Sequence, residues 1–580
     1  MKENMMKKSL LASAAVLISL VSFSRPAGKV VFFGVDGLAS WCVEKALDSI
    51  PERIPNIRRL MDEGCWTLDK RAVYQTSSAI NWATIFMGVP TEMHGYYKWN
   101  SRKSGFEPYA RTYRGMPATL LTLLHEQRPD AVSSCIYDWD GIGYVIDSLS
   151  ATRHCLVPYE PESFPVQEYA RKYALPELGA EIPDFFFFYT VDVDETGHEY
   201  GWGSKEYYDA MARTDEALGL VLDAIDRSPL ASEISFMLSS DHGGGGKAYK
   251  KHGGNDIRDF RTPLLLRGSG FPAGGVINTP VMQYDLTAIL ADLLGLEQPF
   301  EWRGRSDFGI WMPDKICKHP AWPKGKGVQG MDIYGNYLLQ GHNRGMLSIY
   351  RFDGKSIEPL GEFDMDSYHH DNHCNVLSFG PDFWNAKDSL PLLYVSQCSR
   401  KMIEKYKDVC YVERVASDFK SSKKVQTICY DDVNGDFGYA LQWVVDAPNR
   451  MLYGYGNTTY DKDVEGNRHR IIKFALPSPK KKMVVLRPED ALENYCIEDY
   501  GYSFATIGQG LYVRDGLLYM PTGFGTVEYP SYLYVWDLVN KKMVRSVKLR
   551  GLTTGEPEDI SWYDGSLIMS GLHGIFRLPF

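Results

Sequence analysis

The chain has 580 residues, more than one hydrophobic core usually holds, so we expect at least two domains. Its formal net charge of −10 at pH 7 and the lack of a long basic run give no reason to expect a nucleic-acid partner. The ten cysteines form no C-x-x-C pair, and although export would permit disulfides, their spacing names no pairs, so we expect scattered buried thiols.

The first residues have the pattern of a secretory signal peptide. Lys7 and Lys8 precede a short apolar run over residues 10–21, and residues 22–24 form a small-x-small cleavage site. We therefore expect a signal peptide over residues 1–24 and an exported protein, periplasmic or extracellular. An uncleaved anchor is the alternative, but the run is short for a stable membrane span.

Three continuous apolar runs predict buried strands of one sheet. They cover residues 29–37, 183–194 and 234–240, and helical periodicity appears over residues 205–227 and 284–294. This alternation predicts an α/β domain with a doubly wound, mostly parallel sheet over residues 25–315. Residues 96–175 are less regular, and we expect part of them to form a cap over the site.

A hydroxyl-rich turn over residues 74–78 leads directly into an apolar, helix-like segment that ends at Gly88. Ser78 therefore lies at a predicted helix N-terminus, where free N–H groups and the helix dipole favour an anion. The simpler alternative is that a serine at this position is only an N-cap.

Carboxylates and imidazoles gather at the predicted strand ends. Each of the three strands ends in an aspartate, and two further histidines are expected in glycine-flanked loops beside them. A single aspartate there is usually a cap or a turn former, but carboxylate and imidazole together suit zinc or a similar ion. Two such ions suit in-line displacement at phosphorus. The six residues are Asp36, Asp194, His198, Asp241, His242 and His252.

The ordered set of motifs resembles the alkaline phosphatase superfamily, and within it the type I phosphodiesterase and nucleotide pyrophosphatase branch. The resemblance covers about residues 29–304 and implies two divalent metal ions, with zinc the expected metal. It implies that Ser78 is the nucleophile, through a phosphoserine intermediate, and that Asn81 bonds a phosphoryl oxygen. The implied ligands are Asp36, Ser78, Asp241 and His242 for one ion and Asp194, His198 and His252 for the other.

Two departures from that branch limit what the resemblance implies. The branch more often has Thr at the position of Ser78, and its last histidine often lies farther downstream than His252, so nucleotide specificity does not follow. The sulfatase branch needs C/S-x-P-x-R, and residues 78–82 contain neither the Pro nor the Arg.

The motif loops contain no Arg to balance the extra charge of a phosphate monoester. We expect Trp82 and Trp99 to offer a wall to the second substituent of a diester, and Asn100 to contact the substrate. The sequence therefore predicts a phosphodiesterase acting on a small-molecule or glycan-linked phosphate ester. The same site would also serve a phosphomonoesterase or a phosphotransferase, for example of phosphoethanolamine.

After about Trp322 the helical patterns mostly end and short, mostly tyrosine-containing β-like runs recur about fifty to sixty residues apart, a spacing typical of propeller blades. The runs cover residues 337–339, 392–394, 451–453, 517–519 and 566–568. They predict a five-bladed β-propeller over residues 322–580, with a β-sandwich as the alternative. Residues 369–373 resemble a metal tract, but we interpret them as an inter-blade loop. A different class of function remains open, a glycan- or partner-binding propeller protein with a vestigial site.

Overall fold

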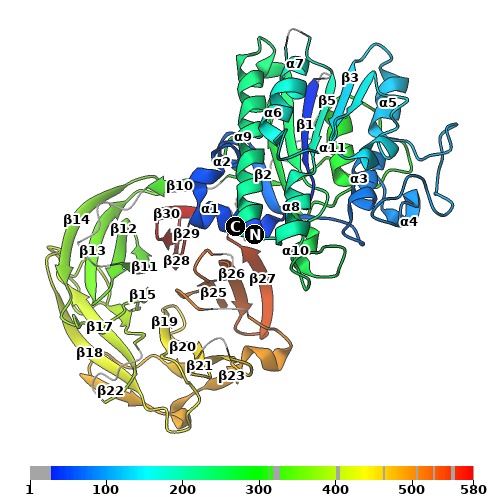
Figure 1. Ribbon diagram of the computed structural model, residues 1–580. Helices are drawn as coiled ribbons and strands as arrows, with labels where there is room; N and C mark the ends of the chain where they lie inside the picture. The colour runs from blue at the N-terminus through cyan, green and yellow to red at the C-terminus, as the bar shows by residue number, and fades with distance from the viewer. Residues whose placement is uncertain are drawn as a thin grey trace, which may run out of the picture. The chain divides into compact units, whose positions relative to one another are not determined.

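The computed structural model describes residues 28–578, apart from residues 180, 313, 318–326, 400–404, 462–463, 505–506, 527–528 and 550–554. The predicted signal peptide and the change of texture at Trp322 lie outside the described residues. The chain divides into two compact units after Met312, and Figure 1 shows an α/β unit and an all-β unit. None of the described helices is both long and apolar enough to cross a membrane.

The first unit contains a mixed sheet of nine strands in the order β4-β3-β5-β1-β6-β7-β2-β8-β9. Only β7 and β9 run against the others, so the predicted doubly wound, mostly parallel fold is confirmed. The bounds are β1 Lys29–Val35, β2 Cys65–Arg71, β3 Ser133–Tyr137, β4 Arg153–Leu156, β5 Phe185–Thr190, β6 Ile234–Ser239, β7 Arg261–Arg267, β8 Gly275–Ile277 and β9 Ile310–Trp311.

The central strands are buried on both faces, which explains why they appear in the sequence as unbroken apolar runs. Along β1, Val30 and Phe32 belong to one core, whereas Val31 and Phe33 belong to another on the opposite face. The first core includes α3 (Ser78–Met87), α5 (Leu120–Gln127) and α11 (Asp285–Leu293). The second includes α1 (Ser40–Ser49), α2 (Pro55–Glu63) and α9 (Lys205–Arg227).

One expectation about this unit was wrong. The apolar run over residues 183–194 is not one strand, because β5 ends at Thr190 and helix α8 (Asp192–Tyr200) begins two residues later. Acidic residues in the first turn of a helix are stabilised by its dipole, so the D-x-D pattern starts α8 rather than extending β5. Residues 96–175 contribute β3, β4 and α5 to the domain, and a cap formed by part of them stays a prediction.

The second unit contains five sheets arranged as a five-bladed propeller, which rules out the β-sandwich. The five recurring runs predicted from the sequence fall on β12, β16, β20, β25 and β29, the second strand of each blade. The blades are β11 Val328–Tyr334, β12 Tyr337–His342, β13 Met346–Phe352 and β14 Ile357–Asp364; β15 Val376–Phe379, β16 Leu393–Ser396, β17 Asp408–Val415, β18 Ser422–Tyr430 and β22 Met483–Leu486; β19 Gln442–Asp446, β20 Met451–Asn457, β21 His469–Ala475 and β23 Glu493–Cys496; β24 Tyr512–Arg514, β25 Leu517–Thr522, β26 Tyr532–Asp537 and β27 Lys542–Lys548; and β28 Pro557–Tyr563, β29 Ser566–Gly571 and β30 Gly574–Leu578.

The fifth blade is completed by β10 (Asp314–Cys317), a strand that precedes the first blade in the sequence and pairs antiparallel with β30. The propeller is therefore closed by strands from its two ends. Residues 369–373 follow β14 and precede β15, so they form a loop between two blades, and His369, His370 and Asp371 lie close enough together in it to be a further candidate metal group.

A buried carboxylate joins the innermost strands of four blades. Asp559 lies on β28, and its Oδ2 accepts hydrogen bonds from the N–H of Met331 at 2.8 Å and of Leu377 at 3.3 Å. Its Oδ1 accepts from the N–H of Leu511 at 3.1 Å, next to β24. An innermost strand has one edge without a strand partner, so Asp559 satisfies N–H groups that would otherwise lack acceptors.

Candidate active site and metal centres

The first ligand cluster consists of Asp36, Asp241 and His242, whose ligand atoms lie within 4.8 Å of one another. Asp36 follows β1, and the other two follow β6. These neighbouring parallel strands bring their carboxyl ends to the same edge of the sheet. His242 Nε2 lies 3.4 Å from Asp36 Oδ1 and 3.2 Å from Asp241 Oδ2, and all three residues are fully buried.

The second ligand cluster consists of Asp194, His198 and His252. Asp194 and His198 are four residues apart on α8, so both face the same side of that helix. His198 was expected in a loop, and its place on α8 corrects that expectation. His198 Nε2 lies 3.4 Å from Asp194 Oδ2 and 3.0 Å from His252 Nε2.

The histidines of both clusters are oriented in the same way. In each ring Nδ1 contacts a backbone carbonyl, at 2.9 Å for His242, 2.7 Å for His252 and 3.1 Å for His198. A carbonyl only accepts, so Nδ1 carries the hydrogen and Nε2 presents its lone pair to the cluster. Two such lone pairs 3.0 Å apart, on His198 and His252, would repel each other, so a proton or a metal ion has to lie between them.

Two buried carboxylate oxygens support the same conclusion. Asp194 Oδ1 and Asp241 Oδ2, one in each cluster, have no hydrogen-bond partner among the described residues. Buried polar atoms in native proteins rarely lack a partner, and a bound ion commonly serves as one. The donors are imidazole nitrogens and carboxylate oxygens that converge from rigid elements, so the two clusters fit divalent metal ions.

Ser78 is the first residue of α3, and its side chain reaches the first cluster. Its Oγ lies 3.2 Å from His242 Nε2 and 3.4 Å from Asp36 Oδ1. Ser77 occupies the N-cap, but its side chain makes no capping hydrogen bond. The structure thus places the hydroxyl of Ser78 within reach of one cluster and at a helix N-terminus, as the sequence analysis anticipated.

Residues 30–262 match the family model described as Type I phosphodiesterase / nucleotide pyrophosphatase, and this span contains both clusters and Ser78. Over these residues the chain is similar to type I phosphodiesterases and nucleotide pyrophosphatases. We call residues 28–312 the phosphodiesterase-like domain.

The similar proteins match part of the chain rather than the whole of it. Venom phosphodiesterase CdcPDE of Crotalus durissus collilineatus is 28% identical over 228 residues, which cover 37% of this chain and 26% of that protein. Ectonucleotide pyrophosphatase/phosphodiesterase family member 1 of Rattus norvegicus is 29% identical over 206 residues, which cover 33% of this chain and 21% of that protein. A structure of murine ectonucleotide pyrophosphatase / phosphodiesterase 5 in complex with AMP is 17% identical, covers 48% of this chain and 97% of its own, and has a TM-score of 0.38.

Trp82 in the phosphodiesterase-like domain does not form a substrate wall, contrary to the sequence expectation. It is fully buried, and its Nε1 donates a hydrogen bond to Asp36 Oδ2 at 2.9 Å. The hydroxyl of Tyr189 donates to the same oxygen at 2.5 Å. Because Oδ2 is held by two donors, Oδ1 is left facing Ser78 and His242.

Asn81 does not face the reacting group either. It is fully buried, and its Oδ1 accepts a hydrogen bond from the N–H of Val73 at 2.8 Å. Its Nδ2 donates to the carbonyls of Gln75 and Ser77 at 3.0 and 3.2 Å. The side-chain amide of Asn81 thus makes its hydrogen bonds to the backbone of the loop that leads to Ser78. Asn81 therefore holds that loop in place instead of bonding a phosphoryl oxygen.

Trp99 and Asn100 are exposed residues of a loop beside the start of α3. The carbonyl of Trp99 accepts a hydrogen bond from the N–H of Ala79 at 3.0 Å, which holds the loop next to Ser78. The Trp99 side chain is 60% exposed. Both residues are therefore accessible from solvent near Ser78. Their contacts with a substrate stay predictions.

Burial gives the carboxyls of the first cluster unusual acidities. Burial and then the charge of Asp194 raise the pKa of Asp36 to about 7, and burial raises the pKa of Asp241 well above its usual range. Burial also lowers the pKa of His242 to about 3. In the second cluster burial opposes ionisation of Asp194, but the imidazoles of His252 and His198 outweigh it and lower that pKa to about 2. A nearby cation would favour the ionised form of every carboxyl here.

The sequence analysis missed two residues behind the first cluster. Lys70 on β2 is fully buried, and its Nζ donates hydrogen bonds to the carbonyl of Ser240 at 2.9 Å and to Gln283 Oε1. Gln283 Nε2 donates to the carbonyl of Asp241 at 2.9 Å. The pair therefore fixes the backbone that carries Asp241. Only the folded chain brings them together, because they lie far apart in the sequence.

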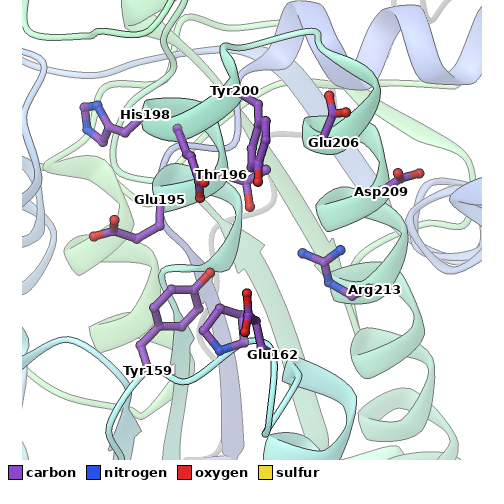
Figure 2. Close-up of a pocket in the computed structure, with 11 residues that line it drawn as sticks. Tyr159, Glu162, Glu195, Thr196, His198, Tyr200, Glu206, Asp209 and Arg213 are labelled. Atoms are coloured by element: carbon purple, nitrogen blue, oxygen red, sulfur yellow. The ribbon is translucent and has the colours of Figure 1, made fainter.

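A hollow of about 600 Å³ lies between α8, α9 and the loop that follows β4, as Figure 2 shows. His198 and Glu195 extend to one side of α8 in this view, and Arg213 extends from α9. Arg213 is paired with Asp192 at 3.1 Å, so the carboxylates dominate the charge of the hollow. The lining residues are Tyr159, Pro161, Glu162, Glu195, Thr196, His198, Glu199, Tyr200, Glu206, Asp209 and Arg213.

Proposed function

We propose that this protein is an exported hydrolase of phosphoric esters, and more closely a phosphodiesterase, that uses two zinc ions and Ser78 as its nucleophile. The observation that carries the proposal is the pair of ligand clusters, each with an orphaned buried carboxylate oxygen, beside a serine at a helix N-terminus. The family match over residues 30–262 supports the same chemistry.

The first cluster with Ser78, and the second cluster, would each hold one ion. Bound there, the ions would lower the pKa of the Ser78 hydroxyl and neutralise charge on the transferring phosphoryl group. The protein's own part is to position these groups. Tyr189 and Trp82 turn Asp36, the backbone carbonyls orient the imidazoles, and the N-terminus of α3 favours negative charge near Ser78.

The reaction proceeds in two displacements. The Ser78 oxygen, having lost its proton, forms a bond to phosphorus as the bond from phosphorus to the ester oxygen breaks, and the released oxygen leaves as an alcohol after taking up a proton. The Ser78 phosphoryl intermediate keeps the second substituent of the diester; water then attacks its phosphorus, the bond to Ser78 breaks, and the oxygen of Ser78 takes up a proton to restore the hydroxyl. The products from a diester are an alcohol and a phosphate monoester.

Diesters fit the charges near Ser78 better than monoesters do. In the described part of the chain, the hydrogen-bond and ion-pair partners of Ser78 and of the two clusters include no Arg or Lys side chain. A monoester dianion would therefore lack a bidentate partner for its extra charge. The phosphomonoesterase and phosphotransferase alternatives would use the same nucleophile.

The names of the relatives support the proposal at a coarser level. They are called venom phosphodiesterases and ectonucleotide pyrophosphatases/phosphodiesterases, and the pattern of residues 1–24 agrees with export. The alternative of a binding protein with a vestigial site is disfavoured, because both ligand clusters are intact.

The proposal can be tested by trapping the covalent intermediate. The zinc-loaded protein should be mixed with an activated aryl diester, quenched in acid within a turnover, digested and analysed by mass spectrometry. We expect a phosphoryl group that still carries the second ester substituent on the peptide that contains Ser78, and none in the Ser78→Ala variant. Turnover by Ser78→Ala at the wild-type rate would overturn the assignment.

A further inference from the structure

Polar side chains meet where the innermost strands of the propeller begin. Asn375 directly precedes β15, Gln442 is the first residue of β19, Gln509 lies shortly before β24, and Glu558 is the second residue of β28. These residues come from four different blades. We call them, together with Glu556, the axial ring.

Hydrogen bonds show that Asn375, Gln442, Gln509 and Glu556 are close together, and Glu558 is two residues from Glu556. Asn375 Nδ2 donates to the carbonyl of Gln509 at 3.0 Å, and Gln442 Nε2 donates to the same carbonyl at 2.6 Å. Gln509 Nε2 in turn donates to Glu556 Oε1 at 2.6 Å. The side-chain amides of Asn375 and Gln442, from different blades, thus donate to the same carbonyl oxygen of Gln509. The side-chain oxygens Asn375 Oδ1 and Gln442 Oε1 therefore also lie near that carbonyl.

The ring contains acceptors that no described residue satisfies. Asn375 Oδ1 and Gln442 Oε1 are buried without a hydrogen-bond partner among the described residues, and each residue is 5% exposed. The carboxyl of Glu558, also 5% exposed, likewise receives no hydrogen bond from the described part of the chain. Every unsatisfied group is an acceptor oxygen, so what is missing is a positive or donating species.

Glu558 owes its position to an irregularity in the strand. The pairing register of β28 with β29 shifts between Pro557 and Asp559, which marks Glu558 as the extra residue of a bulge. Burial, and then the charges of Glu556 and Asp559, raise the pKa of Glu558 to about 9. The protein therefore keeps a carboxyl buried beside two other acids, where only a bound cation would favour its ionised form.

We propose that the axial ring binds a hard divalent cation of the calcium type through the oxygens of Asn375, Gln442 and Glu558. Calcium takes carboxylate and carboxamide oxygens in flexible geometry. The ring offers oxygen atoms only, unlike the imidazole-containing clusters of the phosphodiesterase-like domain, so it does not suit zinc. This site is independent of the proposed hydrolase activity.

The test is calorimetric titration of calcium chloride into the full-length, zinc-loaded protein after removal of free calcium. We expect one calcium site per chain and a rise in the unfolding temperature on saturation. Glu558→Gln keeps the shape of the side chain but removes its charge, and it should weaken calcium binding at least tenfold. Glu489→Gln, which changes an exposed glutamate of the same domain, should leave calcium binding as in the wild type.

Two further variants separate this site from the catalytic centre and from misfolding. Asp194→Asn should bind calcium as the wild type does, because Asp194 lies outside the ring. Gln442→Met should weaken calcium binding while the circular dichroism spectrum stays that of the wild type. The proposal is overturned if calcium does not bind, if it binds equally well to Glu558→Gln, or if Asp194→Asn is the variant that loses it. A protonated Glu558 satisfying the ring internally would give the first of these results.

Discussion

The Nδ1 of His252 donates a hydrogen bond to the carbonyl of Thr76 at 2.7 Å, which joins the second ligand cluster to the loop that delivers Ser78. The N–H of Gly253 adds a bond to Thr76 Oγ1 at 3.0 Å. A ligand of one cluster therefore also holds the backbone two residues before the nucleophile. Changes at His252 should consequently disturb both metal binding and the position of Ser78.

The nucleophile can be identified by comparing two adjacent serines. Ser78→Ala should lower kcat by about a thousandfold or more, because the attacking oxygen is removed. Ser77→Ala should retain most activity, because the Ser77 side chain makes no capping bond and reaches neither cluster. Steady-state kinetics on an aryl diester measures both variants. If Ser77→Ala proves the inactive one, the assignment of Ser78 is wrong.

Metal content should follow the two-cluster arrangement. The purified protein should contain about two zinc-like ions per chain, and Asp194→Asn should contain about one, because it removes a ligand from the second cluster only. Glu195→Gln is the matched control, since it changes the next acid on α8, which lies outside both clusters. Elemental analysis of dialysed protein gives the counts. Equal metal content in Asp194→Asn and the wild type would contradict the ligand assignment.

Tyr189 should act as a positioning residue for Asp36. Tyr189→Phe removes the hydroxyl that donates to Asp36 Oδ2, so Asp36 can rotate, and we expect about a 10- to 100-fold loss of zinc affinity. Competition with a chromophoric chelator measures that affinity independently of turnover. Tyr137→Phe is the control, because Tyr137 is also a buried tyrosine of the sheet but its hydroxyl bonds His154. Unchanged affinity in Tyr189→Phe would show that Asp36 needs no such support.

Substrate charge gives a separate prediction. We expect a higher kcat/KM for an aryl methyl phosphodiester than for the matching aryl phosphomonoester, because no Arg or Lys side chain contacts Ser78 or either cluster among the described residues. The same leaving group in both substrates isolates the effect of the second substituent. A clear preference for the monoester would reject the diesterase assignment and leave the two-metal site standing.

The propeller should lose stability in a pH-dependent way when one hydroxyl is removed. Ser561 Oγ donates to Asp332 Oδ1 at 2.6 Å, and burial raises the pKa of Asp332 from 3.8 to about 6 despite this bond. Since the folded pKa lies above the unfolded one, the carboxyl's contribution to stability is complete below pH 3.8 and declines as the pH rises through 6. Ser561→Ala removes a donor to the ionised form, so the folded pKa should rise further and the decline should become larger.

We therefore expect Ser561→Ala to cost about 1.5–3 kcal/mol in unfolding free energy at pH 8, and less at pH 5. Urea unfolding followed by circular dichroism at both pH values measures the difference. Ser546→Ala, at an exposed position of β27, should show little change at either pH. An equal loss at pH 5 and pH 8 would mean that ionised Asp332 does not depend on Ser561.

Local patterns were sufficient to predict some features and insufficient for others. The six aspartates and histidines of the two clusters could be predicted because they lie in short motifs next to recognisable strands. Tyr189 and Lys70 could not, since their roles arise only when β5 and β2 lie in the folded sheet. Asn81 and Trp82 were misassigned because closeness to Ser78 in the sequence does not show which way a helical side chain points.

In the propeller, too, local sequence patterns predict some features and not others. Its blades were predictable because five similar runs recur, each on the second strand of a blade. β10 was not, because a four-residue strand whose partner lies at the other end of the domain leaves no local pattern. Its inclusion brings the propeller forward to Asp314, ahead of residue 322.

The pairing of β10 with β30 also sets the order of events during synthesis. The ribosome makes β10 before any complete blade and β30 after all the others, so the ring stays open until its final strand is available. Contacts so distant along the chain form slowly, and the incomplete fifth blade exposes strand edges in the meantime. A chain shortened by even the few residues of β30 would therefore resemble a nascent chain, prone to pair with another copy through the edge of β29 that β30 covers in the complete fold.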